Sequence, residues 1–232
     1  MFFSEPADQA VAQLLSDQPH VVMRDQFQMT YDEWHGGPLQ VMKIAGFEIT
    51  PPWLAPAEGL PDRQIVLDPG VVFGTGTHPT TRDCLIALEK IFAGSKIETV
   101  LDIGTGTGLL ALAAARLGAK RVVAVDFNLL AAKTALHNIR LNHLDSRIVA
   151  VQGLAENFID FPSDLVVSNI HFDVMGRLLT ASAFAKSKWF VLSGLLRSQA
   201  KAVTAILEQH PTEILQTWER DGIWHTFLGR VC

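Results

Sequence analysis

The sequence lacks the features that mark secreted, membrane-spanning or metal-binding proteins. Only Cys84 and Cys232 are cysteines among 232 residues, and their separation fits no metal-ligand spacing. No disulfide framework or metal site is therefore expected, and a reducing compartment is indicated. No apolar run is long enough to cross a bilayer, and the N-terminus has no basic stretch followed by a long apolar one. We predict a cytoplasmic protein that binds no membrane.

An excess of basic residues is also absent. The chain has 19 Lys and Arg against 24 Asp and Glu, a formal net charge of −5, so direct binding to nucleic acid is not expected. A hydrophobic content of 48% with 19% charged residues is typical of a globular protein with one substantial core.

One stretch is rich in glycine. A short run over 100–103, apolar except for Asp102, comes directly before three glycines at every second position. These are Gly104, Gly106 and Gly108, and a helix is predicted after them over 109–117. The order strand, glycine turn, helix is expected to place backbone N–H groups and a helix N-terminus against a ligand. Glycines allow the sharp turn and the close approach. The alternative is a turn that only packs a helix onto a sheet.

The spacing of these glycines separates two classes of nucleotide ligand. Dinucleotide-binding proteins favour G-x-G-x-x-G, whereas here Leu109 stands where the third glycine of that motif would fall. A strand predicted over 121–125 ends in Asp126, about 20 residues past the turn, where an acid accepts ribose hydroxyls. The pattern disfavours an oxidoreductase and resembles the class I S-adenosylmethionine methyltransferases. That resemblance implies that the turn cradles the methionine part of the cofactor.

A threonine-rich loop precedes this stretch. Thr80 is predicted to be an N-cap, with Asp83 completing a capping box for a helix over 82–92. Such a helix start suits a carboxylate, and Thr81 would offer its hydroxyl to the same group. Helix capping alone is the alternative. His78 is expected to hold the loop by hydrogen bonds.

The loop carries a closer resemblance. Asp68-Pro69-Gly70 followed by residues 73–81, Phe-Gly-Thr-Gly-Thr-His-Pro-Thr-Thr, resembles the signature of the PrmA family, which methylates the ribosomal stalk protein L11. Similarity extends from about residue 38 through 51–53 to 192–194 and the C-terminal hairpin. The resemblance implies S-adenosyl-L-methionine as cofactor, a protein amine as acceptor, and cofactor contacts at Thr81, Gly104, Asp126 and Asn169. Only about 66 residues precede Asp68, so the family's N-terminal recognition domain is expected to be missing.

The remaining elements alternate between strand and helix. We predict a doubly wound, mostly parallel, seven-stranded Rossmann-like α/β sheet with a C-terminal antiparallel hairpin. The predicted helices are 129–141, 173–185 and 195–209, the strands 148–151, 165–168 and 189–192, and the hairpin 214–218 with 223–228. Residues 1–63 are predicted to form an arm or cap, with a helix over 7–15, a strand over 21–29 and an extended pair over 39–49. Residues 64–232 are predicted to form the methyltransferase domain.

Asn169 is the first candidate for a catalytic role, because the strand before it ends at the edge of the sheet where ligands bind. Its side-chain oxygen accepts an N–H bond from an amine without adding charge. Phe172 would hold the amine by cation–π attraction. His171 would take a proton, or be a structural histidine. Leu154 is predicted to pack on the adenine ring.

The sequence following Asn169 bears on the acceptor. Related amino methyltransferases have Asn-Pro-Pro-aromatic at this point, whereas this chain has Asn-Ile-His-Phe, which argues against base or glutamine methylation. A small-molecule acceptor roofed by residues 1–60, with Trp34, Phe47 and Trp53, is one alternative, and a cofactor-binding protein without turnover is another. Asn138 and Asn142 are predicted to be polar-face or capping residues.

Overall fold

The computed structural model describes the chain except for residues 1–6, 28, 31–32, 34–36, 57–58 and 181–183. The chain forms two compact units, Met1–Leu39 and Gln40–Cys232. The first unit contains α1 (Asp8–Asp17), which buries no residue and confirms the helix predicted near the N-terminus. Residues 21–27 form no strand, so that prediction is wrong for the described part of 21–29. The predicted division at residue 63 stays a prediction.

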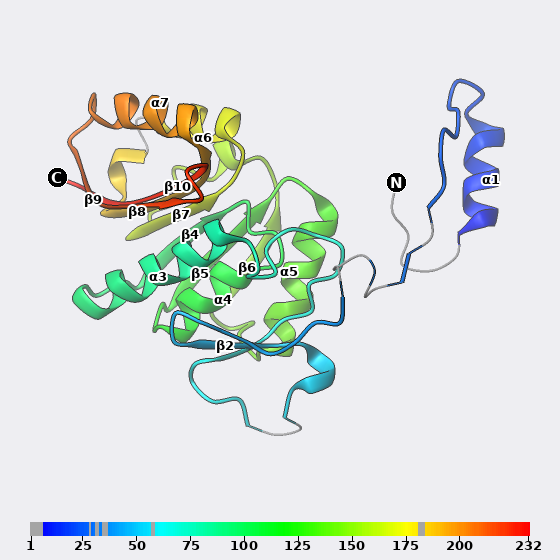
Figure 1. The fold of residues 1–232 in the computed structure, drawn as a ribbon, viewed down its shortest axis with the longest axis horizontal. Helices are drawn as coiled ribbons and strands as arrows, with labels where there is room; N and C mark the ends of the chain where they lie inside the picture. The colour runs from blue at the N-terminus through cyan, green and yellow to red at the C-terminus, as the bar shows by residue number, and fades with distance from the viewer. Residues whose placement is uncertain (1–6, 28, 31–32, 34–36, 57–58, 181–183) are drawn as a thin grey trace. The chain divides into compact units, whose positions relative to one another are not determined.

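A seven-stranded sheet forms the centre of the second unit (Figure 1). Its order is β6-β5-β4-β7-β8-β10-β9, and every pairing is parallel except those of β10 with β8 and β9. The strands are β4 (Thr99–Ile103), β5 (Arg121–Asp126), β6 (Ile148–Gln152), β7 (Leu165–Asn169), β8 (Trp189–Leu196), β9 (Thr212–Arg220) and β10 (Trp224–Val231). The predicted doubly wound sheet and its C-terminal antiparallel hairpin are confirmed. The order reverses between β4 and β7, which is where ligands bind in such sheets.

Helices cover both faces of this sheet. One face packs against α3 (Pro79–Gly94), α4 (Leu109–Arg116) and α5 (Leu129–Leu141), and the other against α6 (Phe172–Thr180) and α7 (Arg197–Leu207). Successive strand residues point to opposite faces, so Val100 joins the first core cluster and Leu101 the second. Both side chains are fully buried, and each face of β4 therefore contributes to a separate hydrophobic core.

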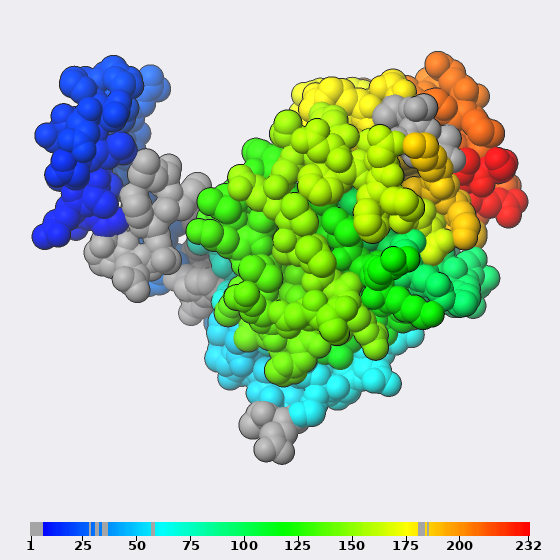
Figure 2. Space-filling view, turned by 180° about the vertical axis from the view of Figure 1, so that it is seen from behind, coloured from blue at the N-terminus to red at the C-terminus, as the bar shows by residue number. Residues whose placement is uncertain are grey.

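A second, three-stranded sheet packs against the outer side of α3 and α4. It contains β1 (Met42–Ile44), β2 (Phe47–Thr50) and β3 (Gln64–Val66), with β1 antiparallel and β3 parallel to β2. Positive φ angles at Ala45 and Gly46 make the two-residue turn between β1 and β2. The extended pair predicted over 39–49 is confirmed. Figure 2 shows this cyan segment beside the yellow-green surface of α5 and β6.

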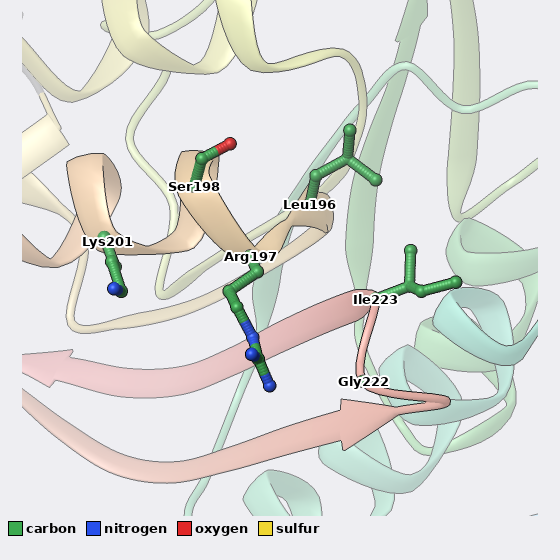
Figure 3. A pocket seen from close by; sticks show the side chains of 6 residues that line it. All are labelled: Leu196, Arg197, Ser198, Lys201, Gly222 and Ile223. Atoms are coloured by element: carbon green, nitrogen blue, oxygen red, sulfur yellow. The ribbon is translucent and has the colours of Figure 1, made fainter.

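Short 3₁₀ turns complete the connections: η1 (Pro52–Leu54), η2 (Ala155–Asn157) and η3 (Phe184–Lys186). A groove of about 450 Å³ lies between the start of α7 and the β9–β10 turn (Figure 3). Among the described residues no helix is long and apolar enough to span a bilayer. In the same part of the chain, no group of His, Cys, Asp and Glu could hold a metal ion.

Candidate functional site

The glycine turn connects β4 to α4 and is packed closely from two sides. Its three glycines all have positive φ, at 73° for Gly104, 55° for Gly106 and 86° for Gly108. A Cβ at Gly104 would overlap Ile170, and one at Gly106 would overlap the carbonyl oxygen of Phe73. Neither the conformation nor the space admits another residue at these positions.

The turn does not present backbone N–H groups, contrary to our expectation. The N–H groups of residues 104–108 all donate within the chain, to the carbonyl oxygens of Val125, Phe73 and Thr105 and to the carboxylate of Asp126. The carbonyl oxygens of Gly104 and Gly106 accept no hydrogen bond from the described residues. The turn therefore offers acceptors, which suit a cationic group of a ligand.

Asp126 lies at the end of β5, where the sequence predicted an acid. The residue is buried, and Oδ2 accepts the N–H of Gly106 at 3.0 Å while Oδ1 accepts that of Asn128 at 2.9 Å. Each carboxylate oxygen retains acceptor capacity beyond these bonds. Asp126 is thereby fixed against the glycine turn, with capacity to accept further hydrogen bonds.

Asp102 is fully buried beneath the same turn. Its Oδ2 accepts the Thr105 hydroxyl at 2.6 Å and the N–H of Ala111 at 3.1 Å. Its Oδ1 has no hydrogen-bond partner among the described residues. Burial raises the pKa of Asp102 to about 7, although the two hydrogen bonds act in the opposite direction. The site thus contains an acceptor atom that the protein itself leaves without a donor.

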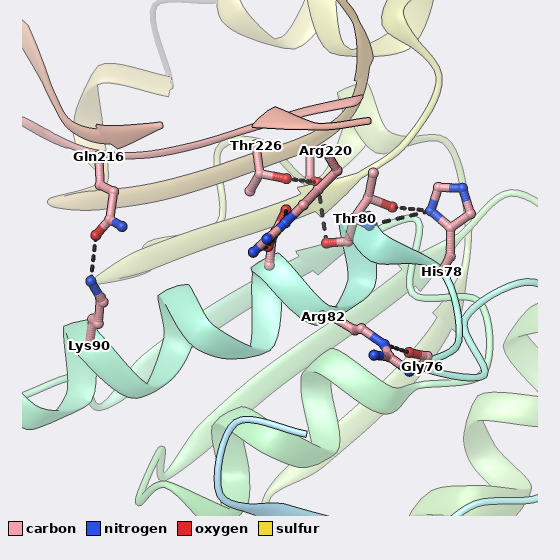
Figure 4. Close-up of polar contacts among 10 residues, drawn as sticks. Gly76, His78, Thr80, Arg82, Lys90, Gln216, Arg220 and Thr226 are labelled. Atoms are coloured by element: carbon pink, nitrogen blue, oxygen red, sulfur yellow. Dashed lines mark hydrogen bonds and ion pairs between the residues drawn. The ribbon is translucent and has the colours of Figure 1, made fainter. Parts of the chain in front are cut away.

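The start of α3 differs from the predicted capping box. The helix begins at Pro79, and the N-cap is His78, whose Nδ1 lies 2.7 Å from the Thr80 hydroxyl and accepts the Thr80 N–H at 3.4 Å (Figure 4). Burial lowers the pKa of His78, which favours the neutral ring that can accept this bond. Asp83 is buried and instead accepts hydrogen bonds from Arg220 at 2.6–3.2 Å. The sequence pattern of a capping box was misleading because a histidine followed by proline fills that place.

The threonine-rich loop lies over the glycine turn. The N–H of Thr107 donates to the Phe73 carbonyl at 3.1 Å, and its hydroxyl donates to the Gly74 carbonyl at 2.7 Å. The His78 ring contacts Phe73 edge-on at 5.4 Å and Trp224 at 4.9 Å between ring centroids. These contacts, with the cap, confirm that His78 holds the loop.

Two asparagines of α5 hold the other end of this loop. Asn138 donates to the carbonyls of Asp68 and Thr107, both at 2.8 Å, and accepts the N–H of Asp68 at 2.8 Å. Asn142, four residues later, accepts the N–H of Val66 at 3.0 Å and donates to its carbonyl at 2.6 Å. Asn142 is the C-cap of α5, which confirms the capping alternative for this residue. Both side chains are buried, so the polar-face alternative is wrong.

Asn169 lies at the end of β7 beside the start of α3. Its Nδ2 donates to the hydroxyls of Thr80 at 3.2 Å and Thr81 at 3.4 Å. Its Oδ1 faces Gly194, where a Cβ would lie 2.8 Å from that oxygen. The structure therefore brings Thr81 and Asn169 together, with the amide nitrogen engaged and the oxygen turned toward a residue without a side chain.

The two residues predicted to assist Asn169 have other contacts in the structure. The His171 side chain is 73% exposed, with Nδ1 3.3 Å from Asp173 Oδ2 at the start of α6. Phe172 is half-buried and packs against the second core cluster. The catalytic roles of His171 and Phe172 stay predictions.

Two exposed apolar side chains follow β5 and β6. Leu154, predicted to contact adenine, is 59% exposed, and Phe127, directly after Asp126, is 73% exposed. The Gly153 N–H donates to the Asp126 carbonyl at 2.9 Å, and Gln152 Nε2 donates to the Phe127 carbonyl at 3.3 Å, so the two strand ends are joined. Phe127 is not among the residues predicted from the sequence, and the signal for it is an aromatic residue directly after an acid at a strand end.

The aromatic roof predicted for a small-molecule acceptor is not supported by Phe47. This side chain is 1% exposed and belongs to the core with α3 and α4, so Phe47 is a core residue and the alternative of an aromatic roof fails for it. Trp53 is 55% exposed, and Trp34 lies outside the described residues.

A family model described as ribosomal protein L11 methyltransferase (PrmA) matches residues 13–231. A relative of that name from Clostridium botulinum (strain Alaska E43 / Type E3) is 37% identical over 188 residues, which are 79% of this chain and 58% of that protein. The chain thus spans little more than half of this relative's length.

Solved structures show the same fold. The ribosomal protein L11 methylase from Lactobacillus delbrueckii subsp. bulgaricus is 29% identical with a TM-score of 0.66, and the match covers 80% of this chain and 94% of that one. TrmK of M. capricolum, solved with S-adenosyl-homocysteine, is 16% identical with a TM-score of 0.51, covering 62% and 67% of the two chains. The second likeness is one of fold alone.

Proposed function

This chain belongs to the ribosomal protein L11 methyltransferase (PrmA) family, and from that premise we propose that it transfers a methyl group from S-adenosylmethionine to a protein amine in the cytoplasm. The observation that carries the proposal is the placement of Asn169, held through its amide nitrogen by Thr80 and Thr81. Its amide oxygen is left to accept an N–H group at the edge where the sheet order reverses.

The residues at this edge fit the parts of S-adenosylmethionine. Asp126 would accept the ribose hydroxyls, while the exposed side chains of Phe127 and Leu154 would pack on adenine. The carbonyls of Gly104 and Gly106 and the unpartnered Oδ1 of Asp102 would accept hydrogen bonds from the ammonium group.

The carboxylate of the cofactor is assigned to the Thr81 hydroxyl, at the positive end of α3. Gly108, whose Cβ position lies 3.2 Å from Ala135, would serve by close packing of the turn and not by contact. The fit therefore rests on an acceptor-lined turn, one acidic residue at a strand end and an apolar surface beside it.

The reaction needs little acid–base chemistry from the protein. The cofactor, when bound, supplies a methyl group already activated on a sulfonium. The protein has to align the acceptor and exclude water. A lysine acceptor, with an ordinary pKa of about 10.4, must first lose a proton. A dry pocket and a nearby positive charge both disfavour the ammonium form. Asn169 Oδ1 would then orient the neutral amine by accepting one N–H.

The test separates cofactor binding from methyl transfer. Calorimetry with S-adenosylmethionine should show binding that Asp126→Ala weakens at least tenfold. Asn169→Ala should weaken it only several-fold, because this variant removes one predicted cofactor contact and the bond to Thr81. Transfer of a labelled methyl group to purified ribosomal protein L11 should fall at least a hundredfold in Asn169→Ala. Tight binding of NADH in place of S-adenosylmethionine would contradict the proposal, and full turnover by Asn169→Ala would contradict the role of Asn169.

A further inference from the structure

The groove beside the β9–β10 turn has walls of two kinds. It is lined by Leu196, Arg197, Ser198, Lys201, Gly222 and Ile223, with a volume of about 450 Å³ (Figure 3). One wall is the end of β8 and the start of α7, and the other is the hairpin turn. We call it the docking groove.

The docking groove lies close to Asn169 along the sheet. Asn169 pairs with Ser193 on β8, and Leu196 stands three residues farther along the same strand, paired with Trp224. Three residues at a rise of about 3.3 Å and a strand separation of about 4.8 Å place the start of the groove within about 11 Å of Asn169. The positive φ of Gly194 and the register shift opposite it shorten this path. An extended polypeptide with its methylated residue at Asn169 would reach the groove with a residue about three positions away.

The groove combines apolar and cationic groups. Leu196 is 40% and Ile223 is 49% exposed, so an apolar side chain of a partner would cover both. Arg197 and Lys201 project from the same side of α7 toward the hairpin. Arg197 pairs with Glu219 at 3.0 Å, whereas Lys201 has neither an ion pair nor a hydrogen bond with any described residue.

The start of α7 adds to the positive character of the groove. The N-cap is Leu196, whose side chain has no acceptor, and the Leu196 N–H donates to Gln199 Oε1 at 2.8 Å. No described side chain accepts the N–H groups of residues 197–199. The first turn of α7 therefore keeps the partial positive charge of a helix N-terminus. Asp221, the acid of the neighbouring turn, does not line the groove. These groups together favour a carboxylate next to an apolar side chain.

We propose that the docking groove binds the segment of the acceptor polypeptide that flanks the methylated residue, and that this segment carries an apolar residue and an acidic residue about three positions away. The inference rests on the proposed function, since it assumes that the acceptor is a polypeptide placed at Asn169. The carboxylate would pair with Lys201, and the apolar side chain would pack between Leu196 and Ile223.

Two fluorescein-labelled eight-residue peptides test this inference by fluorescence anisotropy. Each contains one lysine and, three positions later, a leucine, followed by two glutamates in one peptide and two glutamines in the other. The full chain should bind the glutamate peptide about tenfold more tightly at low salt. Lys201→Glu should abolish this preference. Lys133→Glu, which makes the same charge change at an exposed position of α5, should retain it.

Equal affinity for the two peptides, or a preference that Lys201→Glu leaves intact, would overturn the proposal that the docking groove binds this segment. Ile223→Ser should weaken the binding of both peptides several-fold without changing the ratio of their affinities. This result separates the effect of the apolar contact from that of the charge. Methyl transfer to ribosomal protein L11 is measured separately with labelled cofactor. If the unmodified chain transfers no methyl group but still prefers the glutamate peptide, the result counts against the proposed function and not against peptide binding in the groove.

Discussion

Asp102 shows how a single buried carboxylate can connect ligand binding to pH. Its Oδ1 lacks a partner among the described residues, and burial raises its pKa to about 7. A cationic ligand nearby favours the ionised carboxylate, so ligand binding should lower this pKa and release a proton near neutral pH.

The expected result is an affinity for S-adenosylmethionine that increases as pH rises from 6 to 8. Asp102 is ionised in a growing fraction of the free protein across this interval, so less of the binding free energy is spent on deprotonation. Calorimetry in buffers of different ionisation enthalpy should detect up to one released proton at pH 6.5. In Asp102→Asn the proton release should vanish, and an unchanged release would show that another group titrates.

At the scale of residues, the sequence predicted where a site residue lies better than it predicted which way the backbone groups of the turn point. Asp126 stands at the predicted end of its strand because an acid after an apolar run marks that end. The orientation of the turn's N–H groups was not predictable, since they bond to Val125, Phe73 and Asp126, which lie at other points of the chain. Which groups remain for a ligand depends on those long-range hydrogen bonds.

At the scale of elements, asparagine side chains of α5 bond the backbone at the outer edge of β3, where a further strand would otherwise pair. Asn138 and Asn142 lie on one face of α5 because residues four apart are neighbours on a helix. They bond the backbone of Val66 and Asp68, 70–76 residues away. The edge of the three-stranded sheet is thereby satisfied without another strand. A sequence of two polar residues on a helix does not reveal such a role.

Replacing Asn138 with alanine should lower the free energy of unfolding by about 3 kcal/mol, because the buried carbonyl of Thr107 and two part-buried backbone groups of Asp68 lose their bonds to this side chain. The loop would also lose its tie to Thr107, so cofactor affinity should fall as well. Urea denaturation followed by circular dichroism measures the first effect. Asn157→Ala, at an exposed position of η2, should change stability by less than about 0.5 kcal/mol. Equal effects in the two variants would remove Asn138 from this role.

Helix boundaries were predictable where local sequence determines them and were not where contacts with distant residues do. Helices α4 and α5 were predicted to within a residue at most ends, since their apolar residues recur with helical spacing. The start of α3 was misplaced by three residues because the cap depends on a histidine ring held by Phe73 and Trp224. Helix α6 covers Phe172–Thr180, and residues 184 and 185 of the predicted helix lie in the 3₁₀ turn η3.

At the scale of the whole molecule, a few charged groups join distant parts of the fold. Arg220 at the end of β9 binds Asp83 of α3 across 137 residues of sequence, which ties the C-terminal hairpin to the helix that carries Thr80 and Thr81. The sequence predicted both elements, but pairing between particular charges depends on the tertiary arrangement. Sheet topology, by contrast, was predictable from the alternation of strands and helices.

Asp164 joins three strands where they begin. Its Oδ2 accepts the N–H groups of Glu98 and Thr99 at 2.9 and 3.0 Å, and its Oδ1 lies 2.8 Å from Lys188 Nζ. Asp164 thus contacts the residues that open β4 and precede β8, while its own position precedes β7. Burial acts to raise the pKa of Asp164, but the bond to Lys188 and the backbone bonds together lower it to about 2.

Because the pKa of Asp164 is lowered in the folded chain, its contribution to stability decreases as the pH falls. The unfolded chain has an aspartate pKa of about 3.9, so the stabilisation from Asp164 is fully present above pH 4 and is lost as the pH falls toward 2. Asp164→Asn should therefore unfold more readily than the unmodified chain at pH 7, and the two should converge in stability near pH 2. Thermal unfolding at several pH values measures the difference. A constant difference between pH 5 and pH 2 would mean that the Asp164 carboxylate contributes by its shape and not by its charge.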